Sequence, residues 1–311
     1  MKKRKPNKKK VASSKKPPQP MTSRRSMDKT MSDLQKLLAQ QEFESIDAVN
    51  AFLAENVLGK EMPSFEPQTP LEEAQDLIYD AWETRSKKQR IRLAKKALSI
   101  SEDCVDAYVL LAEEEAKTVQ AAHLHYATGV MAGERLLADE FEEMVGHFWG
   151  IVETRPYMRA RAGLASTFWL QEQYDIAISH YKQLLYLNPN DNQGIRYILL
   201  TCLLSHGTAE EVEELLEAYA DEATAVWCYS WALFTFRKEG NSSLAQSKLQ
   251  DALQMNIHVP EFLLKRRQLP RQLPDYIGFG DETEAAAYTS ENMHLWQEED
   301  GALSWLERSL S

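Results

Sequence analysis

The sequence predicts an all-α protein built from antiparallel helix pairs. Composition, apolar spacing and a recurring pattern of helix, turn and helix all point to this class. Of 311 residues, 43% are hydrophobic and 27% are charged, with few Gly and Pro. Ala, Leu, Glu and Gln dominate and favour helix, whereas alternating runs of β-branched residues are nearly absent. This length allows one long repeat array or two ordinary domains.

Charge is distributed very unevenly along the chain. Residues 1–30 carry twelve Lys or Arg and one acid, Asp28, whereas the remaining chain carries 24 bases and 46 acids. Such a basic segment does not bury enough apolar surface to offset its loss of chain entropy. Residues 1–30 are therefore predicted to be a disordered basic tail. The tail suits contact with nucleic acid or the ribosome, contact with an anionic membrane surface, or folding back onto the acidic body.

Residues 31–66 are expected to form short helices followed by a Pro-rich linker. The first helix starts near Ser32 and presents a face of leucines, and the second covers residues 46–58. The sequence PSFEPQTP, at residues 63–70, then interrupts the chain because Pro and its preceding residue disfavour helix.

Residues 67–311 are predicted to be one helical-repeat domain. The best-formed pair lies within residues 158–191, where Ala165 and Ala177 let two helices approach closely and Pro189 ends the second. Large, small and aromatic residues at these spacings are typical of tetratricopeptide repeats. Weaker pairs are expected at residues 72–98, 105–137, 193–220, 226–255 and 282–310. Consecutive pairs favour a tetratricopeptide-like α-solenoid, because a lone pair cannot bury its own apolar face.

Four sequence blocks resemble one known family. They are residues 107–134 (AYVLLAEEEAKTVQAAHLHYATGVMAGE), 157–185, 258–270 (HVPEFLLKRRQLP) and 280–306. In this order they resemble the suppressor of tumorigenicity seven family, over roughly residues 85–311. The resemblance implies a tetratricopeptide-like architecture and provides no catalytic residues to carry over. Animal members have apolar segments near the N-terminus, where this chain has a basic tail, so it resembles a bacterial-type soluble relative.

A partner-binding groove is expected on the first helix of each pair. In a tetratricopeptide superhelix, these helices line the concave face. The side chains expected there are Arg155, Arg159, Trp169, Gln193, Arg196 and Tyr197. Basic and aromatic groups suit a peptide carboxylate or an acidic segment. Ordinary pairing with the acidic body is the competing interpretation.

No catalytic, metal or cofactor site is expected. His123 and His125 stand two residues apart, which places them on different sides of a helix. The acidic run at residues 113–115 is interpreted as structural or solvated. The segment IGFGDE, residues 277–282, lacks the strand and Lys of a phosphate loop, so Asp281 is expected to cap a helix.

The cysteines, Cys104, Cys202 and Cys228, are odd in number and widely spaced, which indicates buried free thiols in a reducing compartment. No secretory signal is apparent, and no apolar stretch approaches the roughly 20 residues that a membrane span needs. A cytoplasmic location is expected.

The function predicted from these features is that of a non-enzymatic interaction scaffold or adaptor, whose helical-repeat groove binds a peptide or protein partner. The alternative is an RNA- or ribosome-associated factor tethered by its basic N-terminal tail. Aromatic residues are absent from residues 1–30, so stacking on bases is not expected there. The oligomeric state and the identity of the partner are left open.

Overall fold

The computed structural model describes residues 26–60, 63, 65–274 and 276–310. Within these residues the regular structure consists of sixteen α-helices and one short 3-10 helix, and no strand occurs. The predicted all-α class is confirmed. No helix in the described part of the chain is both long and apolar enough to cross a membrane.

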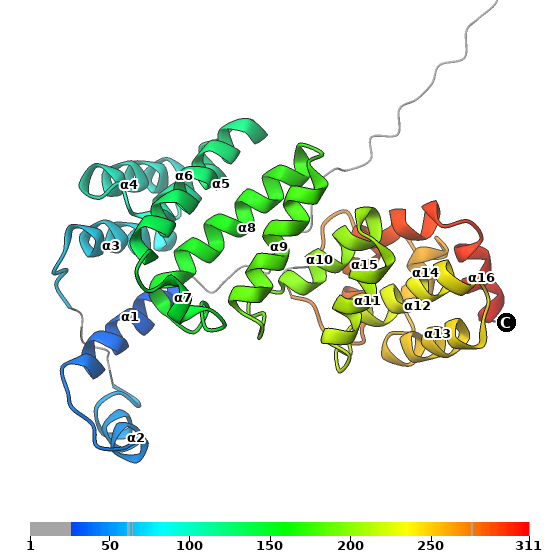
Figure 1. Ribbon diagram of the computed structural model, residues 1–311, viewed down its shortest axis with the longest axis horizontal. Helices are drawn as coiled ribbons and strands as arrows, with labels where there is room; N and C mark the ends of the chain where they lie inside the picture. Colours follow the sequence, from blue (N-terminus) through cyan, green and yellow to red (C-terminus); the bar gives the residue numbers. More distant parts are fainter. Residues whose placement is uncertain (1–25, 61–62, 64, 275, 311) are drawn as a thin grey trace, which may run out of the picture.

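Consecutive helix pairs form the body of the protein (Figure 1). The first helices are α3 (Pro70–Glu83), α5 (Val105–Glu114), α8 (Arg155–Leu170), α10 (Ile195–His206) and α12 (Ala225–Glu239). The second helices are α4 (Lys87–Ile100), α6 (Val119–Leu137), α9 (Tyr174–Leu187), α11 (Ala209–Ala218) and α13 (Ser243–Met255). Each second helix except the last, α13, also packs against the next first helix. We call the first helices together the first-helix row.

Small residues allow the paired helices to approach closely. Ala165 on α8 and Ala177 on α9 are fully buried, as their pattern predicted. Between α6 and α8, a Cβ added to Gly133 would lie 2.8 Å from the ring of Tyr157. Because the interior is packed this tightly, Gly133 has no room for a larger side chain.

Helix termini follow capping rules that the sequence makes visible. Thr208 caps α11 in a capping box with Glu211, whose carboxylate accepts from the Thr208 backbone N–H at 2.8 Å. Asp281 caps α15 (Glu282–Glu298) by accepting from the backbone N–H of Thr283 at 2.7 Å. The prediction that Asp281 caps a helix is confirmed.

Two helices that belong to none of these pairs pack on the first-helix row. Helix α1 (Ser26–Ala39) packs against α3 and the 3-10 helix η1 (Val152–Thr154), and α15 packs against α10 and α12. A buried hydrogen bond of 3.0 Å joins Thr201 of α10 to Asn292 of α15. The remaining short helices are α7 (Phe141–Met144), α14 (Val259–Leu263) and α16 (Ala302–Ser309).

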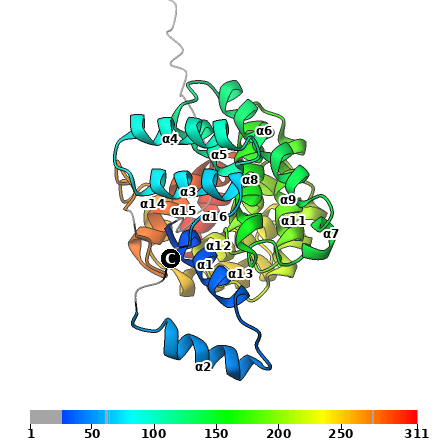
Figure 2. The ribbon, with the colours of Figure 1, turned by 90° about the vertical axis from the view of Figure 1, so that its left-hand side faces the viewer.

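The N-terminal region corrects one predicted boundary. Helix α1 begins at Ser26, so residues 26–30 are helical although we expected disorder up to residue 30. The reason is that Asp28 is neutralised by arginines of α8. The rest of the predicted tail, residues 1–25, lies outside the described residues. Helix α2 (Ile46–Asn56) has no buried residue and lies apart from the other helices (Figures 1 and 2).

Candidate functional site

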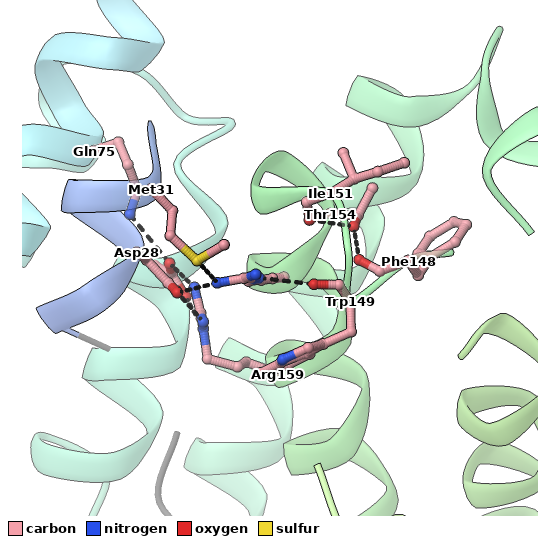
Figure 3. A network of polar contacts seen from close by, with 10 residues as sticks. Asp28, Met31, Gln75, Phe148, Trp149, Ile151, Thr154 and Arg159 are labelled. Atoms are coloured by element: carbon pink, nitrogen blue, oxygen red, sulfur yellow. Dashed lines mark hydrogen bonds and ion pairs between the residues drawn. The ribbon is translucent and has the colours of Figure 1, made fainter. Parts of the chain in front are cut away.

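The candidate site lies where the first turns of α8 meet α1. Arg155 and Arg159 stand one helical turn apart, so both side chains project from the same face of α8. They converge on Asp28 of α1, whose Oδ1 accepts from Arg155 Nη1 at 2.7 Å and whose Oδ2 accepts from Arg159 Nη1 at 2.7 Å. Figure 3 shows Asp28 facing Arg159 between the two helices. Each carboxylate oxygen therefore has its own guanidinium.

Arg159 is held in place by a second acid. Its Nε and Nη2 donate to the two carboxylate oxygens of Asp106 on α5, at 2.8 and 2.6 Å, in a bidentate pair. The Trp82 ring lies 5.3 Å from the guanidinium carbon, and Gln75 donates to Asp106 at 3.1 Å. These contacts fix the guanidinium and leave Nη1 directed at α1.

Arg155 is positioned by the loop that precedes α8. Its Nε donates to the Trp149 carbonyl at 2.9 Å, and its guanidinium lies 5.5 Å from the Trp149 ring. The Thr154 hydroxyl donates to the carbonyls of Phe148 and Ile151, which closes this loop (Figure 3). The Arg155 side chain is consequently held by a folded loop and is not free to rotate into solvent.

All four charged side chains are buried. The exposed fractions are 7% for Arg155, 7% for Arg159, 4% for Asp28 and 0% for Asp106. Burial alone would lower the pKa of Arg159, but the charges of Asp106 and Asp28 and their hydrogen bonds outweigh it and raise that pKa. Two cations and two anions make a neutral group. We call the surface formed by Arg155, Arg159 and Asp106 the α1 seat.

The six side chains expected in one groove fall into three places. Arg155 and Arg159 lie together in the α1 seat, but they are buried and paired with the chain's own Asp28. Trp169 lies at the far end of α8, where its ring contacts Tyr174 at 4.8 Å and His206 at 5.4 Å between ring centroids. In this conformation Trp169 is therefore separate from the two arginines of the α1 seat.

The other three residues lie at or just before the start of α10, where Arg196 and Tyr197 form a separate cluster. Arg196 donates to Glu222 at 2.9 and 2.6 Å, and its guanidinium lies 4.6 Å from the Tyr197 ring and 5.3 Å from the Tyr219 ring. Gln193 is 5% exposed. Arg196 is half-buried and pairs with an acidic residue of the same chain, Glu222.

Sequence reasoning missed Asp28 and Asp106 as members of the site. Asp28 is a lone acid in a basic segment and lies 127 residues from Arg155 in sequence, so no local spacing connects the two. From the sequence alone, Asp106 is indistinguishable from any acidic residue in the first turn of a helix. The sequence placed the arginines at the start of the best-formed helix pair, but this did not indicate their partners.

The other candidate groups take part in packing. His123 lies 3.0 Å from the Thr167 hydroxyl and contacts the Phe168 ring. In the acidic run, Glu114 pairs with Arg90 at 2.6 Å. Within the described residues, no group of three or more His, Cys, Asp or Glu side chains is arranged to hold a metal ion.

The cysteines are free thiols, of which Cys104 and Cys202 are buried and Cys228 is half-buried. Burial raises the pKa of Cys104 to about 12 and that of Cys228 to about 11. Because the thiolate is the reactive form, these thiols are poor nucleophiles near neutral pH.

These observations define the class first: an all-helical protein of consecutive helix pairs, with a buried arginine site that holds an additional helix. Comparison with known proteins then gives the family. The family model described as ST7 protein matches residues 66–145, from the start of the helix pairs to the loop after α7. Residues 66–145 match the ST7 family, which confirms the resemblance drawn from the sequence.

Relatives extend this similarity over most of the chain. The Suppressor of tumorigenicity 7 protein-like of Gallus gallus is 28% identical over 260 residues, which are 74% of this chain and 45% of that protein. The Homo sapiens protein of the same description is 27% identical over 263 residues, which are 74% of this chain and 44% of that protein. The Protein ST7 homolog of Drosophila melanogaster is 26% identical over 258 residues, which are 75% of this chain and 48% of that protein. The chain spans about half the length of these curated relatives.

Proposed function

We propose that this protein is a tetratricopeptide-like α-solenoid that acts as a non-enzymatic scaffold and holds a segment of a protein partner on its first-helix row. One observation carries the proposal: α1, which belongs to no repeat pair, is seated on this row by side chains that bind a carboxylate. The row therefore has the chemistry needed to hold a helical segment.

Two further features support a binding role. Helix α15 also packs across α10 and α12, so the first-helix row receives added helices at two places. The described thiols have raised pKa values, and both buried arginines pair with carboxylates, which fits structure and recognition better than bond-making chemistry.

Photo-crosslinking from matched positions tests this proposal. A benzophenone amino acid replaces Tyr197, on the first-helix row, or Tyr186, which is 60% exposed on the second helix α9. In cells of the source organism, we expect the probe at position 197 to capture a defined protein partner and the probe at 186 not to capture it. Equal capture from both positions, or none from either, would contradict the proposal.

A polyanion partner for the basic tail is a second proposal, which rests on the eleven Lys and Arg of residues 1–25. Since α1 begins at Ser26, these residues can be removed without removing the helix that fills the α1 seat.

A further inference from the structure

The contacts of α1 differ from those of a helix that belongs to a core. Among residues 27–39, the buried residues are Asp28 and Asp33, both acids. The leucines Leu34, Leu37 and Leu38 remain partly exposed. A helix normally docks by burying an apolar stripe, so α1 is held chiefly by charge.

We propose that the α1 seat is a binding site for an acidic helix of a protein partner, and that α1 is its exchangeable occupant within the chain. This inference rests on the proposed function and names the partner's chemistry. The partner helix carries an Asp or Glu in its first turn and a large apolar side chain four residues later.

The carboxylate requirement follows from the charges of the seat. Without Asp28, the seat holds two arginines and one acid, Asp106, and two guanidinium N–H groups lose their acceptors. The vacated seat therefore carries a net positive charge and presents two guanidinium N–H donors. It would favour a carboxylate, which accepts charge-assisted hydrogen bonds from both, over a neutral or basic group.

The apolar requirement follows from an imperfect fit beneath α1. A cavity of ≈ 150 Å³ lies between α1, α3, α6 and the start of α8, and Ser32 and Lys36 are the α1 residues that line it. Apolar side chains of Leu71, Val105, Leu136, Leu137, Val152, Pro156 and Tyr157 line part of it, and the polar side chains of Glu72, Gln75, Asp76, Asp103 and Glu153 also line it. A cavity of about this size accommodates a benzene-sized group. Ser32 lies one turn after Asp28, so a Leu or Phe at this place would fill space that Ser32 leaves empty.

The remaining attachments of α1 are weak enough to permit exchange. Lys29 pairs with Asp76 at 3.6 Å and Lys36 with Glu72 at 3.2 Å, and all four side chains are between about a quarter and a third exposed. Exposed pairs of this kind contribute little. The chain after α1 leads into α2, which has no buried residue, so α1 can leave without disturbing the helix pairs.

The test uses full-length chain and fluorescent peptides of residues 26–39. The chain variant Lys29→Glu with Lys36→Glu loosens α1 from outside the seat and leaves its arginines intact, and Asp28→Asn loosens it from inside. We expect the peptide to bind both variants at least about tenfold more tightly than the wild-type chain, because the resident helix reduces the fraction of open seats.

Matched peptides test each chemical requirement. The Asp28→Asn peptide should not bind, whereas the Ser32→Leu peptide should bind about tenfold more tightly by burying its side chain in the cavity. Failure of the peptide to bind either variant, or equal binding of the Asp28→Asn peptide, would overturn the proposal. A wild-type chain that sediments as a dimer with exchanged α1 helices would also overturn it, because a second copy would then be the occupant.

The two proposals fail separately. A partner captured at position 197 together with no peptide binding would retain the scaffold and reject this site. Peptide binding without such a partner would retain the α1 seat as a binding site and reject the scaffold function.

Discussion

At the scale of single residues, the α1 seat and Asp28 together form a neutral group of four buried charges. Arg159 has the central place, because it bonds to Asp106 within the repeats and to Asp28 on α1. Its loss would leave the carboxylate of Asp106 buried without a cation. Asp28 is different, since α1 can detach and the arginines can then be hydrated.

This difference predicts unequal effects of two substitutions. Arg159→Gln should lower the free energy of unfolding by about 3–5 kcal/mol, as expected for breaking a buried pair. Asp28→Asn should lower it by only about 1.5 to 2 kcal/mol, because the cost is limited to undocking α1. Urea denaturation followed by circular dichroism measures both. Equal losses would show that α1 is an integral part of the core.

The environment of His180 predicts a pH dependence of stability. Burial, followed by the positive charges of Arg161 and His123, lowers the pKa of His180 to about 4. Its ring stacks on Phe168 at 5.3 Å, and its Nδ1 has no hydrogen-bond partner in the structure. The unfolded chain therefore takes up a proton near pH 6.5, before the folded chain does.

Stability should consequently fall as the pH drops from about 6.5 to about 4. After allowance for solvent screening, we expect His180 to contribute about 1 to 2 kcal/mol to this fall. His180→Gln should reduce the fall by that amount. Parallel pH profiles of unfolding for wild type and variant would contradict this assignment.

At the scale of helices, close approach depends on particular small residues. Gly133 of α6 faces Tyr157, which is 1% exposed and packs against the rings of Phe141 and Phe148. Gly133→Ala would gain about 1 kcal/mol of helix propensity but meet a ring that cannot move aside. We expect a net loss of about 1 to 2 kcal/mol. Thr128→Ala, at an exposed position of α6, is the control and should be neutral or slightly stabilising.

The elements themselves were largely predictable from the sequence. The pair expected within residues 158–191 is α8 and α9, and the weaker pairs also correspond to observed helices. This success reflects local signals: helical spacing of apolar residues, capping residues such as Thr208, and glycines in turns. The start of α1 was placed six residues too late, at Ser32, because its first turn is stabilised by arginines far away in sequence.

The candidate site was predictable only in part for the same reason. Arg155 and Arg159 were identified from their place at the start of the best-formed helix pair, but their burial depends on Asp106 and Asp28, which only the folded chain brings to them. Trp169 and Arg196 were expected on the same groove surface, and they occupy separate clusters because each pairs with its own neighbours.

At the scale of the whole molecule, the first-helix row is covered in two places by helices of the same chain, and a basic segment precedes one of them. The eleven Lys and Arg of residues 1–25 should give salt-sensitive binding to single-stranded RNA. Deletion of residues 1–25 should abolish this salt-sensitive binding. Unchanged RNA binding would show that the rest of the chain binds the RNA. The affinity of the α1 seat for the peptide, which the deletion should leave unchanged, is the control.

The central claim is that α1 is docked as a charge-held ligand of α8. Amide hydrogen exchange of the full chain, measured between about 0.05 and about 0.5 M NaCl, tests it most directly. A free helix of this length is unstable in water, so undocking of α1 removes its protection. We expect protection of residues 30–39 to fall with salt while protection of α8 stays unchanged. Equal and salt-independent protection of both helices would contradict the claim.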